Sequence, residues 1–189
     1  MIKLIKNLLS KEKADIIERD LLGHHWTWHW NESTLKQNEL DEFKTKNTVD
    51  TGQFIHRVYW NDEKQGGQSN FYEGFKKVFD AVNYENAIRI KCNLNLNKTG
   101  YKKTSHQPIH RDSPLEDYKS LIYYINDSDG DTILFDNNLK EIKRVKPKKN
   151  TALLFDSNIL HCGCSPIKSH TRGVINFIFK GNEKNILHR

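Results

Sequence analysis

The chain has 189 residues, of which 36% are hydrophobic, 29% are charged and 11% are aromatic. This length suits one folded domain over residues 1–189, and the aromatic content is enough for a packed core. The composition excludes collagen-like and low-complexity proteins, and no apolar run is long enough to span a membrane. The net charge of +6 is mostly lysine spread along the chain, which favours a soluble surface over a nucleic-acid interface.

The cysteines and the first residues bear on where the protein works. Three cysteines cannot all pair within one chain, so Cys92, Cys162 and Cys164 do not make a disulfide framework. The stretch from Met1 to Leu9 interrupts its apolar residues with lysines and does not resemble a signal peptide. We therefore expect a cytoplasmic protein.

Residues 1–85 predict a mixture of strands and helices. Ser10 is a suitable cap for a helix over residues 11–22, in which Ala14, Ile17 and Leu21 share one face. Alternation predicts a strand that carries three tryptophans on one face as part of the core. These tryptophans are Trp26, Trp28 and Trp30. The other predicted elements are a strand at 2–9, a long loop and candidate lid at 31–52, a strand at 53–60 and a helix at 70–83.

From residue 86 the pattern changes to short apolar stretches separated by turn residues. These stretches predict strands at 87–96, 107–111, 119–125, 131–136, 140–146, 151–156, 159–162 and 173–179. So many short strands in succession indicate a sandwich or jelly roll. We expect the two preceding helices to cover one of its sheets.

The motif His110-Arg-Asp112 is the first sign of chemistry. On a strand, residues two apart leave the same face, so an imidazole and a carboxylate could bind one metal ion. His161 follows the apolar strand at 151–156 and is a candidate third ligand. Two histidines and one carboxylate are the ligand set of non-haem Fe(II) oxygenases, and they leave other metal positions open.

Arg172 stands at the head of the last predicted strand, on the same face as Val174, Asn176 and Ile178. A buried arginine at this position needs an anion. A dicarboxylate would supply one, because a guanidinium can bind a carboxylate through two parallel hydrogen bonds.

With these motifs, residues 89–180 resemble the catalytic core of the iron(II)- and 2-oxoglutarate-dependent dioxygenases, and most closely the prolyl-4-hydroxylase-like branch. The motifs that carry the resemblance are His110-x-Asp112, Leu121–Asn126, Gly130–Phe135, Leu154–His161 and Arg172-x3-Asn176. The resemblance implies a mainly β fold with flanking helices and a double-stranded β-helix (jelly-roll) core. The core would span residues 86–180, with residues 1–85 as helical and strand support.

The resemblance also implies a site. His110, Asp112 and His161 would bind Fe(II), and Arg172 would hold the distal carboxylate of 2-oxoglutarate with help from Tyr124. Asn176 matches a small polar position in the pocket. The family's usual tyrosine before the His-x-Asp motif has no match here, and its substitute is left open. The candidates for that substitute are Asn93, Asn95 and Tyr101.

The implied reaction uses Fe(II), 2-oxoglutarate and O2 to hydroxylate an unactivated C–H bond, for example in a prolyl or other peptide side chain. An oxygenase acting on a small metabolite or a nucleic-acid base is an alternative. Ile178 counts against the nucleic-acid branch, which carries a second arginine at that position. A third hypothesis is a non-catalytic metal-binding jelly-roll module. Arg172 counts against it, because such a module needs no residue to anchor a keto acid.

Substrate choice is expected to depend on the loops at 31–52, 61–68 and 97–107, because loops on a rigid scaffold commonly carry specificity. The last loop is basic, which suggests an acidic substrate or carrier. Its basic residues are Lys98, Lys102 and Lys103.

Overall fold

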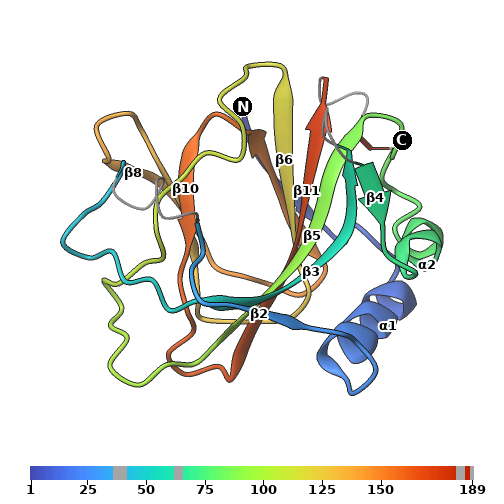
Figure 1. The fold of residues 1–189 in the computed structure, drawn as a ribbon, viewed down its shortest axis with the longest axis horizontal. Helices are drawn as coiled ribbons and strands as arrows, with labels where there is room; N and C mark the ends of the chain where they lie inside the picture. The colour runs from blue at the N-terminus through green and yellow to red at the C-terminus, as the bar shows by residue number, and fades with distance from the viewer. Residues whose placement is uncertain (36–41, 62–65, 182–185, 188–189) are drawn as a thin grey trace.

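The computed structural model describes residues 1–35, 42–61, 66–181 and 186–187, and it is mostly β with two helices, as predicted (Figure 1). The helices are α1 (Lys11–Leu22) and α2 (Tyr72–Val78). The strands are β1 (Ile2–Lys6), β2 (His29–Asn31), β3 (Gln53–Asn61), β4 (Gly66–Gln68), β5 (Ala87–Leu96), β6 (Tyr118–Tyr124), β7 (Thr132–Phe135), β8 (Glu141–Val145), β9 (Thr151–Asp156), β10 (Leu160–Gly163) and β11 (Thr171–Lys180).

The strands form two antiparallel sheets. The large sheet has the order β1-β9-β6-β11-β5-β3-β2, with β4 paired to β3, and the small sheet has the order β10-β7-β8. In Figure 1 the small sheet lies beside the large one, and the long strands β3, β5 and β11 curve toward it. This sandwich has the jelly-roll architecture that the sequence predicted.

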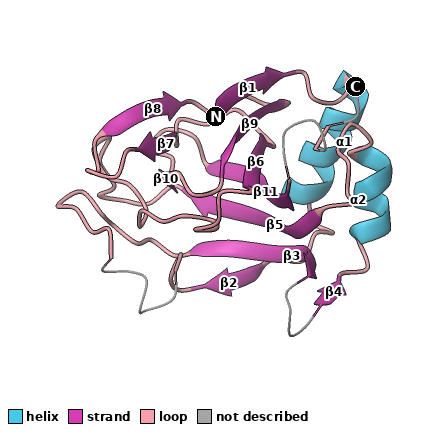
Figure 2. Cartoon of the chain, turned by 90° about the horizontal axis from the view of Figure 1, so that it is seen from above, coloured by secondary structure: helices cyan, strands magenta, loops and turns pink. Residues whose placement is uncertain are grey.

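The two helices cover the outer face of the large sheet, which confirms their predicted place (Figure 2). Ser10 caps α1 by accepting a hydrogen bond from the Lys13 amide at 3.3 Å. Ile17 and Leu21 of α1 are buried in the same core cluster as Phe75 of α2 and Phe177 of β11. Neither described helix is long and apolar enough to cross a membrane.

The other face of the large sheet packs against the small sheet. Along β6, Leu121 and Tyr123 face the helices, whereas Ile122 and Tyr124 belong to a second cluster with Leu134 of β7. The second half of β6 is therefore buried on both faces, which explains its unbroken apolar sequence Leu121–Tyr124.

Apart from shifted strand ends, such as β1, which ends at Lys6 and not at residue 9, one predicted helix and one predicted strand differ. The helix predicted at 70–83 is only Tyr72–Val78, because the backbone leaves the helical conformation at Phe79. No strand forms at 107–111; His110 makes only an isolated bridge with His161. Local alternation could not reveal that this segment lacks a neighbouring strand along most of its length.

The predicted tryptophan face is also wrong. Only Trp30 lies in β2, where it is 53% exposed and contacts Phe54. Trp26 and Trp28 lie in the connection after α1 and pack against the core under the helices. The indole N–H of Trp28 donates to the Leu21 carbonyl at 3.1 Å, which ties this connection to the end of α1.

Candidate metal centre and active site

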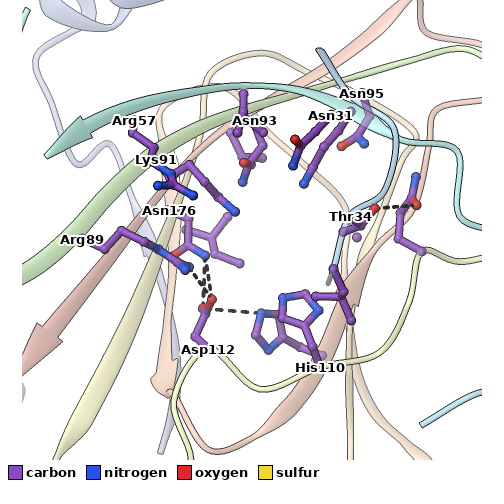
Figure 3. Close-up of a pocket in the computed structure, with 18 of the residues that line it drawn as sticks. Asn31, Thr34, Arg57, Arg89, Lys91, Asn93, Asn95, His110, Asp112 and Asn176 are labelled. Atoms are coloured by element: carbon purple, nitrogen blue, oxygen red, sulfur yellow. Dashed lines mark hydrogen bonds and ion pairs between the residues drawn. The ribbon is translucent and has the colours of Figure 1, made fainter. Parts of the chain in front are cut away.

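A polar cavity of about 780 Å³ opens on the inner face of the large sheet (Figure 3). Its walls come from β3, β5 and β11, from the segment Asn31–Leu35, and from the loop that carries His110 and Asp112. Each of the loops expected to determine specificity reaches the cavity: 31–52 contributes this segment, 61–68 contributes Asn61 and 97–107 contributes Gln107. Residues 36–41 and 62–65 of these loops lie outside the described residues. Lys98, Lys102 and Lys103 do not line the cavity.

His110, Asp112 and His161 meet at one end of the cavity. One candidate ligand atom of each lies within 4.8 Å of those of the other two. Two reciprocal backbone hydrogen bonds hold the histidines side by side: the His110 amide donates to the His161 carbonyl at 3.0 Å, and the reverse bond is 2.9 Å. The Asp112 amide donates to the Ser157 carbonyl at 3.1 Å. The three predicted ligands are thus brought together by a bridge between loop and strand.

Each of the two histidine rings has an unprotonated nitrogen that is available to a metal ion. The Nδ1 atoms of His110 and His161 lie 3.1 Å from the carbonyls of Pro108 and Ile159. A carbonyl only accepts, so each Nδ1 donates and each Nε2 keeps its lone pair. Burial lowers the pKa of His110 to about 3, with a further contribution from His161, so the ring is neutral near pH 7.

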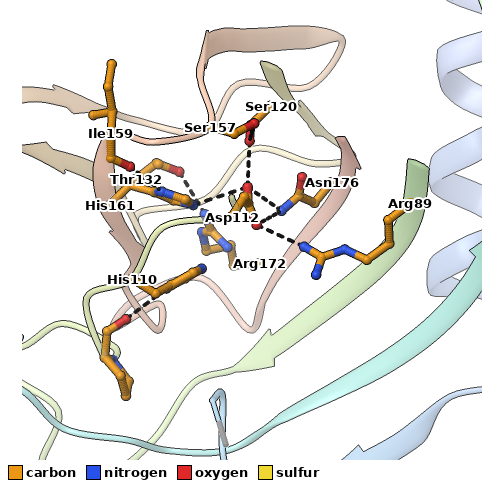
Figure 4. Close-up of polar contacts among 11 residues, drawn as sticks. Arg89, His110, Asp112, Ser120, Thr132, Ser157, Ile159, His161, Arg172 and Asn176 are labelled. Carbon is orange, nitrogen blue, oxygen red and sulfur yellow. Dashed lines mark hydrogen bonds and ion pairs between the residues drawn. The ribbon is translucent and has the colours of Figure 1, made fainter. Parts of the chain in front are cut away.

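The Asp112 carboxylate is fixed by side chains from three strands (Figure 4). It accepts hydrogen bonds from Ser120 at 2.7 Å, from Arg89 at 2.9 Å, and from Asn176 at 3.1 Å to each oxygen. Burial alone would raise its pKa, but the His161 ring and the Arg89 guanidinium outweigh this effect and lower it. Asp112 is therefore an anion with a set orientation.

Arg172 lies deep in the same cavity and is only 4% exposed. Its guanidinium group donates to the Gly130 carbonyl at 2.7 Å, to Thr132 Oγ1 at 2.8 Å and to Asn95 Oδ1 at 3.4 Å. Among the described residues no carboxylate forms an ion pair with it. A buried cation with only neutral partners fits an anionic ligand.

Tyr124 is fully buried and does not line the cavity. Its hydroxyl donates to Thr132 Oγ1 at 3.0 Å, and burial raises its pKa to about 12. Thr132 thus accepts from both Tyr124 and Arg172, which leaves its own O–H free to donate. Of the residues considered as substitutes for the family's tyrosine, Asn93 and Asn95 line the cavity and Tyr101 does not.

Four residues that shape the site are not among those predicted from the sequence. They are Arg89, Lys91, Ser120 and Thr132. For two of them the sequence contains a pattern: β5 alternates polar and apolar residues, and its polar positions include Arg89 and Lys91. The alternation shows that these residues share a face, but it does not show that this face lines a cavity.

Gly130 allows the Arg172 side chain to lie against the backbone, and Gly130→Ala is expected to disturb it. A Cβ at this position would lie 2.4 Å from the Cys164 carbonyl oxygen and 2.9 Å from Arg172 Cδ. We expect a loss of about 1–3 kcal/mol in the free energy of unfolding, measured by urea denaturation. Gly74→Ala is the matched control, because a Cβ there meets nothing within 4 Å in α2. Equal stability of both variants would contradict the close packing at Gly130.

The residues present fit a ferrous ion and a keto acid. Two neutral imidazole nitrogens and one carboxylate form a compact donor set that faces an open cavity, which suits a non-haem Fe(II) site. Arg172 and the free Thr132 hydroxyl supply donors for a carboxylate in the same cavity. The arrangement therefore combines a metal site with an anion site.

Comparisons with known proteins agree with this geometry. A family model described as the 2OG-Fe(II) oxygenase superfamily matches residues 92–180. The comparison with curated proteins found no match. Among solved structures, a 2OG-Fe(II) oxygenase family oxidoreductase from Burkholderia pseudomallei is 11% identical with a TM-score of 0.62, and the match covers 96% of this chain and 88% of that one.

Two other solved structures share the fold. A prolyl hydroxylase from Trichoplax adhaerens, in complex with a hypoxia inducible factor peptide fragment, is 15% identical with a TM-score of 0.60, covering 97% of this chain and 85% of that one. The alpha ketoglutarate dependent epimerase SnoN is 7% identical with a TM-score of 0.57, covering 95% and 78%. At these identities the likeness shows the fold alone. The family model adds that residues 92–180, which contain His110, Asp112, His161 and Arg172, are similar to the 2OG-Fe(II) oxygenase superfamily, whose members use Fe(II), 2-oxoglutarate and O2.

Proposed function

We propose that this protein is an Fe(II)- and 2-oxoglutarate-dependent dioxygenase that hydroxylates an unactivated C–H bond, with residues 1–189 acting as one oxygenase domain. The observation that carries the proposal is the meeting of His110, Asp112 and His161 in the cavity that also contains Arg172. A non-catalytic metal-binding module would have no use for a buried, uncompensated arginine there.

In this proposal His110, Asp112 and His161 are the iron ligands. The Nδ1–H groups of the histidines stay bound to backbone carbonyls, which keeps both Nε2 lone pairs directed at the metal. Ser120, Arg89 and Asn176 hold the Asp112 carboxylate in one orientation. When bound, the iron supplies the activation of O2 that couples conversion of 2-oxoglutarate to succinate and CO2 with hydroxylation of the substrate.

Arg172 binds the distal carboxylate of 2-oxoglutarate. Thr132 donates its hydroxyl proton to the same carboxylate, because its acceptor positions are used by Arg172 and Tyr124. Tyr124 therefore acts by orienting Thr132. Asn176 keeps a buried Oδ1 without a hydrogen-bond partner among the described residues, and this atom is available to a ligand in the cavity.

Two classes of substrate have support for the group that is hydroxylated. A prolyl or other peptide side chain is suggested by the likeness to the Trichoplax adhaerens prolyl hydroxylase. A small molecule is favoured by the polar lining of the cavity and by its volume, which falls in the range of small-molecule sites. A nucleic-acid base is the less favoured alternative, because residue 178 is Ile.

The test is a substrate screen read out by succinate formation. We expect slow succinate release from 2-oxoglutarate that requires added Fe(II), and faster release with a true substrate, whose mass increases by one oxygen atom. Succinate release that persists at the same rate after complete removal of metal would contradict the proposed function.

A further inference from the structure

A second group of cations lies along the cavity wall, away from Arg172. Arg57 of β3 and Lys91 of β5 are directly paired across the two strands, and Arg89 lies two residues from Lys91 on the same face. All three line the cavity, and Figure 3 shows them on the wall that leads toward Asp112. We refer to Arg57, Arg89 and Lys91 as the cationic wall.

Within the described residues, the positive charges of the cationic wall outnumber the carboxylates near them. Among the described lining residues, five cations face two carboxylates, Glu32 and Asp112; the cations are Arg57, Arg89, Lys91, Arg111 and Arg172. Arg89 pairs with Asp112, but in the described part of the chain no residue forms a hydrogen bond or ion pair with the charged end of Arg57 or Lys91. Burial, followed by the charge of Arg89, lowers the pKa of Lys91 to about 7, although Asp112 opposes this effect.

2-oxoglutarate bound at Arg172 is shorter than the backbone distance from Arg172 to the Arg57–Lys91 pair of the cationic wall. The register of β11 and β5 places Arg172 opposite Asn95 and Asn176 opposite Lys91. Asn95 and Lys91 are four residues apart on one strand, which is about 13 Å. The carbon chain of 2-oxoglutarate has four C–C bonds of about 1.5 Å each and spans at most about 6 Å. The Arg57–Lys91 pair is therefore available to a second anion.

Between the two positions the cavity offers further unpaired polar atoms. Asn93 Oδ1, Asn95 Nδ2 and Asn176 Oδ1 are buried and have no hydrogen-bond partner among the described residues. Asn95 is only 3% exposed and Asn176 only 6%. Buried polar atoms without partners are costly, so these amides point to ligands that carry both donors and acceptors.

On the basis of the proposed function, we infer that the primary substrate is a small, polar organic acid whose carboxylate or phosphate group binds Arg57 and Lys91, with Arg89 beside them. The acid group holds the molecule at the end of the cavity away from Arg172, and the carbon to be hydroxylated lies near His110 and Asp112. The specificity determinants are then strand residues and not the lysines of the loop at 97–107.

The inference can be tested by binding of matched acid and neutral probes to anaerobic protein saturated with Fe(II) and 2-oxoglutarate. The probes are propanoate against propanamide and glycerol 3-phosphate against glycerol, measured by calorimetry. We expect one acid to bind at least about tenfold more tightly than its neutral partner, and Arg57→Met/Lys91→Met to remove that preference. Preference for propanoate or for glycerol 3-phosphate identifies the acid group as carboxylate or phosphate.

Two further arms separate this inference from the proposed function. Lys98→Met/Lys102→Met/Lys103→Met is the control, because these exposed lysines do not line the cavity, and the preference should survive in it. Titration of the metal-free protein and of its Arg172→Met variant with 2-oxoglutarate tests the Arg172 site, because only binding that the variant loses is assigned to Arg172. If 2-oxoglutarate binds but neither acid is preferred, or if the loop variant loses the preference, the inference is wrong and the proposed function stands. If an acid binds through Lys91 while 2-oxoglutarate does not bind, the proposed function is wrong instead.

Discussion

His161→Ala should abolish Fe(II)-dependent release of succinate from 2-oxoglutarate. The substitution removes one of the three proposed ligands, and the remaining pair, His110 and Asp112, cannot complete the site. Loss of a residue that only supports a ligand typically weakens metal binding about 10- to 100-fold, so loss of a ligand should exceed about 100-fold. Metal binding by dialysis and succinate release by mass spectrometry measure the two effects separately.

The fold of the His161→Ala variant should survive. The bridge between His110 and His161 uses backbone amides and carbonyls, which alanine retains. His24→Ala is the matched control, since His24 is exposed and lies in the turn after α1. A folded His161→Ala protein that still binds Fe(II) and releases succinate at the rate of the control would refute the ligand assignment.

Arg172→Met should weaken 2-oxoglutarate binding at least about 30-fold. Removing one partner of a buried, hydrogen-bonded charge pair costs about 2–5 kcal/mol, and each 1.4 kcal/mol is a factor of ten. Calorimetric titration with 2-oxoglutarate measures the loss directly. Arg172→Lys should recover only part of the affinity, because an ammonium group keeps the charge but lacks the planar pair of donors.

The control for Arg172→Met is Arg19→Met on α1, whose side chain is 73% exposed and pairs with the adjacent Asp20. It removes the same group without touching the cavity. Metal binding should stay normal in both variants, since Arg172 contacts none of the three proposed ligands. Unchanged 2-oxoglutarate affinity in Arg172→Met would exclude Arg172 as the anchor.

Elements with strong local signals were predictable from the sequence. The capped helix at 11–22 and the strands at 87–96 and 151–156 have the predicted bounds, because capping and apolar periodicity are encoded within each segment. The sequence also predicts that His110, Asp112 and His161 converge. It predicts this from a strand at 107–111, and that strand does not form. The sequence cannot show that His110 is held by a single bridge to β10 and not by a continuous strand.

What the sequence could not predict is the environment of each polar face. Arg89, Lys91, Asn93 and Asn95 alternate with apolar residues and look like one side of a solvent-facing strand. Their surroundings depend on the curvature of the large sheet and on the position of the small sheet, which are properties of the whole chain. Ser120 was missed for the same reason, because only the fold brings its hydroxyl to Asp112.

At positions 110 and 161, backbone hydrogen bonds hold the two residues in place, whereas their side chains supply the candidate metal-binding atoms. Every residue except proline has both the backbone N–H and the carbonyl that this pair needs. Other metal-binding side chains can therefore occupy these two positions without a change in the backbone. Cysteine or aspartate at position 161 would present a different atom from the same backbone location. The protein is therefore a suitable frame for engineering centres with altered metal preference.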